Sequence, residues 1–486
     1  MTYVVAIDAG TTGVRSRAVF ADGRESVASY LEFSQHFPEP GRVEHDAEEI
    51  WSVTRRTLAD VISRIGSLPA AIGITNQRET VVAWDRSTGK PFGRAIVWQD
   101  RRTSERCAEL SDHLALVRAT TGLVLDPYFS GTKIEWLLRN GVPVGPSLAF
   151  GTIDTWILWN LTNGEVFATD ESNASRTMLW DITRHRWSNE LCGLLGVPID
   201  TLPEVRDSSG RFGVTSADGL PNGIPISGIA GDQQAALFGQ ACFDSGDAKN
   251  TYGTGSFVLM NSGTTCPPPT EGMLTTVAWR LDGVTTYAVE GSIFVTGAAV
   301  QWLRDGLGII RESRYIESLA AMVPDSGGVV FVPALTGLGS PWWDPEARGA
   351  IFGITRGTTA AHLALATIEA MAFQTRDVVD AMTAATGIAI RTLRVDGGAA
   401  GNDRLMQIQA DQLGITVERP VDRETTAVGA ALLAGLAEGV WSSLADAAST
   451  RSIDRQFSPN TEFKFFSDLA HSQWRAALAR VTAAVR

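Results

Sequence analysis

Asp232 stands where an apolar strand-like run gives way to a helix. The run 225–231 ends in Gly231, and an Ala-rich helical pattern follows, with Gln233 and Gln234 beside the carboxylate. We expect Asp232 at the N-terminus of the helix, where a carboxylate accepts backbone N–H groups and complements the helix dipole. Two interpretations stay open. Asp232 is either an ordinary helix cap, the commoner role for an isolated Gly-Asp pair, or a catalytic base with Gln233 as a substrate ligand.

Three glycine-rich turns are spaced along the chain. Residues 8–13 (Asp-Ala-Gly-Thr-Thr-Gly), 252–255 (Tyr-Gly-Thr-Gly) and 396–398 (Asp-Gly-Gly) each follow a strand-like run. Glycines allow close approach of a ligand to backbone N–H groups, threonines add hydroxyl donors, and Arg15 adds a cation beside the first turn. These turns fit phosphate cradles, although each alone also fits an ordinary hairpin, and the first is not a Walker A loop.

Side chains suited to a polyol lie between the first two turns. Arg78 and Glu79 stand where one strand gives way to another, Trp98 ends a further strand, and Tyr128 lies on a loop before a helix. A hydroxyl group both donates and accepts hydrogen bonds, so a cation and a carboxylate together match its two roles. An aromatic ring can cover the carbon skeleton. The alternatives are a surface ion pair and a core tryptophan.

The composition bounds the class of protein. A chain of 486 residues exceeds the roughly 250–300 residues at which one core stops growing, so two lobes are expected. The net charge of -13 argues against nucleic-acid and anionic-membrane partners. Four scattered cysteines without a CxxC pattern argue for a reducing compartment and against a zinc site. A strand run starts at residue 3, and no apolar window is long enough for a span, so we expect no signal peptide, no membrane insertion and a cytoplasmic location.

The order of the expected elements indicates an α/β protein with a duplicated core. Residues 3–33 predict an antiparallel meander around the first Gly-Thr turn, and residues 247–260 repeat the strand–turn–strand pattern half a chain later. We therefore assign residues 1–245 to an N-terminal lobe and residues 246–486 to a C-terminal lobe. The polar residues 169–179 predict a loop. Helical patterns are expected at 46–66, 152–161, 359–386 and 425–436, with a turn and a helix at 291–303.

The order of these motifs along nearly the whole chain resembles the FGGY carbohydrate kinases, and among them the glycerol kinases. The segments that carry the resemblance are 8–12, 76–79, 97–103, 126–133, 173–179, 231–235, 252–255, 331–339 and 396–398. The resemblance implies the two-lobed actin/hexokinase/Hsp70-type (ribonuclease H-like) fold, with duplicated mixed-sheet domains and an interlobe cleft. It also implies phosphorylation of glycerol by ATP to sn-glycerol 3-phosphate, in glycerol catabolism and with Mg²⁺.

The resemblance assigns a role to each motif residue. Asp232 is the expected general base, and Asp8 is expected to orient Mg²⁺. Glycerol is expected to contact Arg78, Glu79, Trp98, Tyr128, Asp232, Gln233 and Phe257. The phosphates are expected to meet Thr11, Thr12, Gly13 and Arg15 in the first turn and Thr254 and Gly255 in the second. The adenine nucleotide is expected to contact Gly297, Gln301, Gly398, Ala399 and Asn402.

The first turn departs from the family's usual Asp-Gln-Gly-Thr-Thr-Ser. Ala9 and Gly13-Val14 replace the Gln and the Ser, and we expect a tuned rate or KM with activity retained. Gly223 stands where family members inhibited by fructose 1,6-bisphosphate carry Arg, so we expect no such inhibition at that site. Family members often form homodimers or homotetramers, and the sequence does not decide between these states. The alternatives to a glycerol kinase are a kinase for another small polyol or ketose, and a nucleotide-switched protein of the same fold that is not a kinase.

Overall fold

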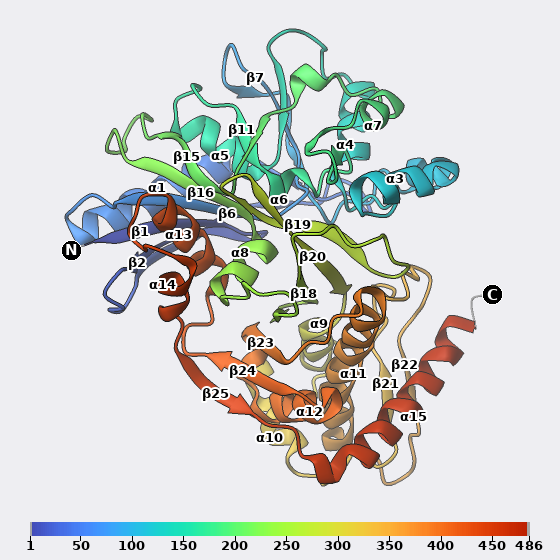
Figure 1. Ribbon diagram of the computed structural model, residues 1–486. Helices are drawn as coiled ribbons and strands as arrows, with labels where there is room; N and C mark the ends of the chain where they lie inside the picture. The colour runs from blue at the N-terminus through green and yellow to red at the C-terminus, as the bar shows by residue number, and fades with distance from the viewer. Residues whose placement is uncertain (1, 484–486) are drawn as a thin grey trace.

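The N-terminal meander lies at one side of a six-stranded mixed sheet. The protein is described by a computed structural model that covers residues 2–483 (Figure 1). Strand β1 pairs antiparallel with β2 and parallel with β6, and β6 pairs parallel with β16. The sheet order is β15-β16-β6-β1-β2-β3, with β1 (Tyr3–Ala9), β2 (Gly13–Phe20), β3 (Val27–Glu32), β6 (Ala71–Asn76), β15 (Ser209–Val214) and β16 (Pro225–Gly231).

A second mixed sheet in the C-terminal half repeats this plan. Strand β17 pairs antiparallel with β18 and parallel with β23, as β1 does with β2 and β6. The order is β19-β20-β18-β17-β23-β24-β25, with β17 (Ala248–Tyr252), β18 (Ser256–Gly263), β19 (Leu274–Leu281), β20 (Val284–Ile293), β23 (Thr392–Gly397), β24 (Thr416–Pro420) and β25 (Ile453–Phe457). The expected two-lobed fold with duplicated mixed sheets is confirmed.

Helices cover both faces of the N-terminal sheet. Successive side chains of its strands point to opposite faces, and those on both faces are buried. Tyr3, Val5 and Ile7 of β1 point to a core that holds α1 (Ala47–Ile65) and α5 (Ile153–Leu161). Val4 and Ala6 point to the opposite core, which holds α8 (Asp232–Gly239) and α13 (Thr425–Ala437) and also takes in residues of β18, β19 and β20. This second core therefore joins the two lobes, with α8 near the centre of Figure 1.

The Ala- and Gly-rich helix α13 approaches the N-terminal sheet very closely. A Cβ atom at Gly73 of β6 would lie 2.1 Å from the carbonyl oxygen of Ala430, and one at Gly228 of β16 would lie 2.4 Å from the nitrogen of Ala434. Only glycine fits at these strand positions. The helix comes late in the sequence, yet it packs on the first strands of the chain.

The remaining helices and strands complete both lobes. In the N-terminal lobe these are β4 (Gln35–His36), β5 (Glu44–His45), β7 (Val82–Asp85), β8 (Lys90–Pro91), β9 (Ala95–Ile96), α2 (Ser104–Glu109), α3 (Leu114–Thr121), α4 (Ser130–Arg139), β10 (Leu148–Gly151), β11 (Ala168–Asp170), α6 (Glu171–Ala174), β12 (Trp180–Asp181), β13 (Arg186–Trp187), α7 (Asn189–Leu194) and β14 (Glu204–Arg206). In the C-terminal lobe they are α9 (Gly297–Gln301), α10 (Ile316–Ala320), β21 (Val330–Val332), β22 (Ala350–Phe352), α11 (Ala360–Thr386), α12 (Asp403–Leu413), α14 (Leu444–Ser449) and α15 (Lys464–Ala483).

One expected element is wrong. Residues 169–179 are not a polar loop, because they contain the end of β11 and the helix α6, and all of them are buried. Asp170 caps α6 by accepting the N–H groups of Ser172 and Asn173, and it also accepts from Ser208 Oγ at 2.7 Å, so this polar side chain is buried with its partners. The expected helices at 46–66 and 359–386 are confirmed by α1 and α11.

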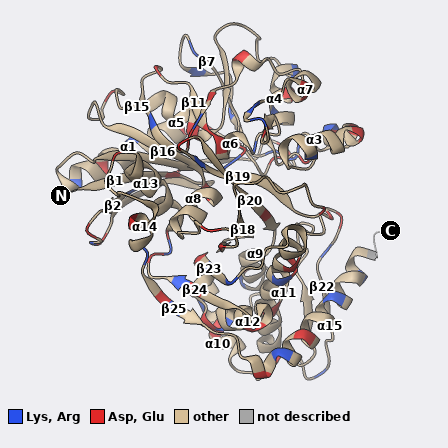
Figure 2. Cartoon of the chain, in the orientation of Figure 1, with Lys and Arg blue, Asp and Glu red and all other residues tan. Residues whose placement is uncertain are grey.

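Charged residues of both signs occur in both lobes (Figure 2). Lys and Arg are interspersed with Asp and Glu in both lobes (Figure 2). Across residues 2–483, no helix combines the length and apolar character that crossing a membrane requires.

Candidate active site

The site forms where three parallel strands end side by side. Strands β1, β6 and β16 are neighbours, and their carboxyl ends carry Asp8, the segment 76–79 and Asp232. Carboxyl ends of parallel strands are the usual location for ligand sites in open α/β sheets. The topology thus brings together residues that are more than 200 positions apart in the sequence.

Arg78 is the centre of a buried ion network. Its two η nitrogens donate to the carboxylate of Glu290 at 2.6 and 3.1 Å, and its Nε lies 3.2 Å from Oδ1 of Asp232. Gln234 accepts from Nη1 of Arg78 at 3.2 Å. Glu290 belongs to β20 of the C-terminal lobe, so this bidentate pair connects the two lobes and fixes the plane of the guanidinium.

Arg176 extends the network to Glu79. Its Nε donates to Glu79 Oε1 at 2.7 Å and its Nη2 donates to Glu290 Oε1 at 3.0 Å. Burial opposes ionisation of Glu290, but Arg176 and Arg78 outweigh it and lower the pKa of this carboxyl to about 2. Burial raises the pKa of Glu79, and the same two arginines counter that rise. Two guanidinium groups therefore orient two buried carboxylates, and they favour the charged form of Glu290.

Aromatic rings enclose the network. The rings of Trp98 and Tyr128 meet edge to face with centroids 5.6 Å apart, and the Tyr128 hydroxyl accepts from Arg78 at 3.3 Å. Phe257 lies beneath the Arg78 guanidinium, whose carbon is 5.8 Å from the ring centroid. Donors, acceptors and apolar walls thus converge at one place, and this combination suits a small polyol.

Asp232 is the most accessible carboxylate of this cluster. It lies at the N-terminus of α8, as expected, but as the first helical residue. The interpretation of Asp232 as the N-cap is wrong, because the preceding Gly231 occupies that position. Its Oδ1 accepts the N–H of Gln233 at 2.7 Å, while 29% of its side chain stays exposed. Burial raises its pKa, and Arg78 and Lys249 counter that rise. Gln233 in turn accepts from the Lys249 ammonium.

The first Gly-Thr turn is held by side chains. Trp98 Nε1 donates to Thr11 Oγ1 at 3.0 Å, Thr12 lies 3.4 Å from the hydroxyl of Tyr30, and Arg15 forms an ion pair with Glu424. A Cβ at Gly13 would lie 2.5 Å from the Leu31 carbonyl oxygen. The absence of a side chain at Gly13 therefore has a steric reason.

A buried histidine supports the same turn. His45 Nε2 lies 2.7 Å from Gln35 Oε1, and its Nδ1 lies 3.3 Å from Gln77 Nε2. The two amides donate onward to the carbonyl oxygens of Thr11 at 2.9 Å and Gly10 at 3.1 Å. Burial, together with His36, lowers the pKa of His45 to about 4, which matches a neutral ring that donates from Nε2 and accepts at Nδ1.

A cavity of about 480 Å³ lies in the C-terminal lobe at the second and third glycine-rich turns. Its wall combines glycine backbone with apolar side chains such as Ile368 and Met371. Gly255 lies outside the lining of this cavity. The expected nucleotide ligands that line it are Thr254, Gly297, Gln301, Gly398, Ala399 and Asn402.

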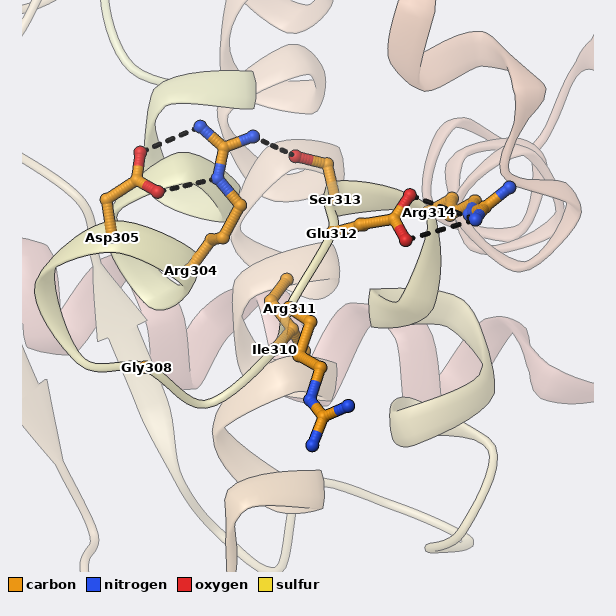
Figure 3. A pocket seen from close by; sticks show the side chains of 8 residues that line it. All are labelled: Arg304, Asp305, Gly308, Ile310, Arg311, Glu312, Ser313 and Arg314. Carbon is orange, nitrogen blue, oxygen red and sulfur yellow. Dashed lines mark hydrogen bonds and ion pairs between the residues drawn. The ribbon is translucent and has the colours of Figure 1, made fainter.

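A more open pocket of about 780 Å³ lies beside this cavity and shares Ser313 and Arg314 with it (Figure 3). Two of the arginines that line it, Arg304 and Arg314, have anionic partners. Arg304 donates twice to Asp305 at 2.7 Å, and Arg314 donates to Glu312 at 3.0 Å. None of the expected site residues lines this pocket, so it does not compete with the glycine-lined cavity as the nucleotide site.

Sequence reasoning missed four residues of the cluster: Arg176, Gln234, Lys249 and Glu290. Glu290 and Lys249 had a detectable signal, because each is a single charge inside an otherwise buried strand run. A buried charge needs a partner, and such a residue therefore points to an ion network. Arg176 lies in the segment that was expected to be a loop.

Comparison with known proteins decides the family. Residues 3–239 match the N-terminal domain of the FGGY family of carbohydrate kinases, and residues 248–438 match its C-terminal domain. The chain belongs to the FGGY family of carbohydrate kinases.

Relatives of this FGGY kinase match it over almost its whole length. The glycerol kinase of Deinococcus radiodurans is 53% identical, with 98% of this chain and 97% of that protein covered. The glycerol kinase of Carboxydothermus hydrogenoformans is 52% identical, with 98% of each chain covered. The solved structure of Plasmodium falciparum glycerol kinase with ADP superimposes with a TM-score of 0.93 at 35% identity, over 99% of this chain and 98% of that one.

Proposed function

We propose that this kinase transfers the γ-phosphate of ATP to a terminal hydroxyl of glycerol and forms sn-glycerol 3-phosphate. The observation that carries the proposal is the cluster in which Arg78, Asp232 and Tyr128 meet within hydrogen-bonding distance beside the Trp98 ring. The cluster offers donors, acceptors and an apolar wall within the span of a three-carbon polyol. The full-length relatives named glycerol kinase support the same reaction.

Asp232 acts as the general base in this proposal. Its carboxylate is the accessible one of the cluster, whereas Glu290 and Glu79 are each committed to arginines. It aims the terminal hydroxyl at the γ-phosphate and takes its proton, a role worth about 10²–10⁴-fold in rate. Arg78, Glu79, Tyr128 and Gln233 bind the hydroxyls, and Trp98 and Phe257 pack on the carbon edge.

The two Gly-Thr turns face the phosphates of ATP in this proposal. Thr11, Thr12, Gly13 and Arg15 contact them from the N-terminal lobe, and Thr254 and Gly255 from the C-terminal lobe. The nucleoside occupies the 480 Å³ cavity, where Gly297, Gln301, Gly398, Ala399 and Asn402 contact it. In-line placement and charge neutralisation supply most of the catalysis in such a transfer.

The residues present fit a magnesium ion that is shared with the nucleotide. Among residues 2–483 there is no cluster of three or more acidic, His or Cys side chains arranged to hold a metal by themselves. Mg²⁺ needs no such cluster, because it usually keeps waters and binds one or two carboxylates together with substrate phosphates. Burial and the facing Asp232 raise the pKa of Asp8 to about 7, and a cation there would stabilise its charged form. Asp8 would hold the ion, which neutralises phosphate charge when bound.

We also propose that the lobes divide at residues 1–245 and 246–486, and that the protein acts in the cytoplasm. The division is supported by the position of the second sheet, which begins with β17 at Ala248. The location is supported by four cysteines that are all free: Cys107, Cys192, Cys242 and Cys266.

A substrate panel tests the proposed function. Release of ADP is followed with ATP, Mg²⁺ and glycerol, xylulose or erythritol. We expect strong turnover with glycerol. Strong turnover on xylulose or erythritol without turnover on glycerol would show that glycerol is not the substrate. Hydrolysis of ATP that no polyol affects would contradict a kinase function.

A further inference from the structure

Lys133 is a fully buried lysine whose hydrogen-bond partners are all backbone carbonyls. It lies in the first turn of α4, and its Nζ donates to the carbonyl oxygens of Tyr128 at 2.5 Å, Phe129 at 3.3 Å and Glu79 at 3.4 Å. Within residues 2–483, no carboxylate lies within 4.0 Å of this ammonium. An ammonium has three protons and no lone pair, so the three carbonyls match its hydrogen-bonding capacity.

The three carbonyls belong to two segments that are about 50 residues apart in the sequence. Glu79 follows β6, and Tyr128 and Phe129 precede α4. Both segments carry expected glycerol ligands, namely the side chains of Arg78, Glu79 and Tyr128. Lys133 is therefore placed where the two halves of the glycerol site meet.

The backbone at Glu79 needs such support. Its φ is 61°, a left-handed conformation that is unfavourable for a residue with a side chain and that persists only where surrounding contacts impose it. Its carbonyl oxygen accepts from Lys133 and also from Ser130 Oγ at 3.1 Å, while Arg176 holds its carboxylate. The backbone and the side chain of Glu79 are thus fixed by different partners.

We propose that Lys133 is a positioning residue for glycerol, because its ammonium ties the backbone of Glu79 to the backbone of Tyr128 and sets the distance between their side chains. The inference rests on the proposed function, since it assumes that these side chains bind the substrate. A buried ammonium without a counter-charge is costly, and burial lowers the pKa of Lys133 to about 7. An apolar residue of similar length would not carry this cost, but it would leave the two segments untied.

The test replaces Lys133 by methionine, which has a similar length and no donor. We expect the KM for glycerol in K133M to rise about tenfold or more, because two ligand-bearing segments lose their shared donor, while the KM for ATP stays within about twofold. The nucleotide cavity has no lining residue from either segment. A loss of structure alone would not separate the two KM values in this way.

A matched control is T132V in the same helix. Thr132 is buried and its hydroxyl lies 2.9 Å from Thr103 Oγ1, so the variant loses a buried hydrogen bond without touching the glycerol segments. We expect both KM values of T132V to remain near wild type. If K133M does not fold, S130A serves instead, because it removes only the second donor to the Glu79 carbonyl, and we expect about a threefold rise in glycerol KM.

The outcomes separate the inference from the proposed function. Folded K133M with a glycerol KM within twofold of wild type overturns the positioning role, as does an unchanged S130A where K133M is unfolded. Equal rises in the KM for glycerol and for ATP also overturn it. The wild-type protein alone tests the proposed function, which is contradicted if this protein does not phosphorylate glycerol. The variants test only the positioning role of Lys133.

Discussion

The proposed glycerol site is built from charged side chains that hold one another, whereas glycine backbone and apolar side chains form much of the wall of the proposed nucleotide cavity. Arg78 and Arg176 share Glu290, and the side chains of all three residues are at most 1% exposed. Gly253, Gly297 and Gly398 line the C-terminal cavity, and a Cβ at Gly398 would meet no protein atom within 4 Å. Both regions grow from the same strand plan, in which a central strand pairs antiparallel on one side and parallel on the other.

The difference follows from the chemistry of the two ligands. Glycerol offers three hydroxyl groups on a short carbon chain, so its site needs donors and acceptors held at fixed positions in a rigid frame. A nucleotide offers a flat ring and charged phosphates, which backbone N–H groups and close approach can bind. Substitutions on the glycerol side should therefore act through charge and orientation, and those on the nucleotide side through volume.

The largest effect is expected for D232N. The asparagine keeps the size of the side chain but cannot take the proton of the attacking hydroxyl, so kcat should fall about 10²–10⁴-fold. The KM for ATP should change little, because Asp232 does not line the nucleotide cavity. Steady-state ADP release checks both values. A kcat within tenfold of wild type would show that Asp232 is not the base.

The next effect is expected for E290Q. The change leaves Arg78 and Arg176 buried without their shared counter-charge, and removing one partner of a buried ion pair costs about 3–5 kcal/mol. We expect lower stability in urea unfolding and a glycerol kcat/KM that falls about 100-fold.

A control for E290Q is E135Q, which removes a buried carboxylate that pairs with Arg106 and Arg139 outside the cluster. It should lower stability and leave the glycerol KM unchanged. If E135Q and E290Q reduce glycerol kcat/KM equally, the ion network is a stability element and not part of substrate recognition.

Residue types and their order along the chain were sufficient to predict the family, the fold and the places where the strands end. Asp232, Arg78 and the glycine-rich turns are local signals, since each combines a special residue with an adjacent strand or helix pattern. Gly297 and Gln301 lie on α9 and face the cavity as expected.

Nonlocal partners could not be predicted in the same way. Glu290 meets Arg78 across 212 positions, and α13 packs on strands that lie more than 350 positions earlier. The prediction of a loop at 169–179 was wrong, because a polar composition normally indicates exposure to solvent, whereas this segment is buried. Its polar groups instead find buried partners, as Asp170 shows by accepting from the hydroxyls of Ser172 and Ser208.

The two Gly-Thr turns should also differ in their response to pH. The N-terminal turn is backed by neutral His45, whose pKa is about 4 when folded and about 6.5 when unfolded. The unfolded chain then binds more protons between these values, so this contribution is full above pH 6.5 and is lost as the pH falls toward 4. The loss amounts to about 3 kcal/mol.

Urea unfolding of wild type and H45Q between pH 4 and 7 checks this prediction. The difference in unfolding free energy between the two proteins should shrink as the pH falls. The C-terminal turn supplies the contrast, because Thr296 and Ser256 support it with hydroxyl groups that do not titrate in this range. A difference that stays constant with pH would mean that His45 is not held neutral.

The smallest effect is expected on the nucleotide side, for G398A. A Cβ at Gly398 meets no protein atom within 4 Å, and the residue lines the cavity, so the methyl group would occupy space that the nucleotide needs. Overpacking of this kind costs about 1–3 kcal/mol, and we expect the KM for ATP to rise about tenfold with the glycerol KM unchanged. G193A is the matched control, because Gly193 also has open space around its Cβ position but lies in α7, away from the cavity. If G398A instead raises the glycerol KM, or leaves both values at wild type, the nucleotide does not approach this backbone, and the contrast between a side-chain site and a backbone site fails.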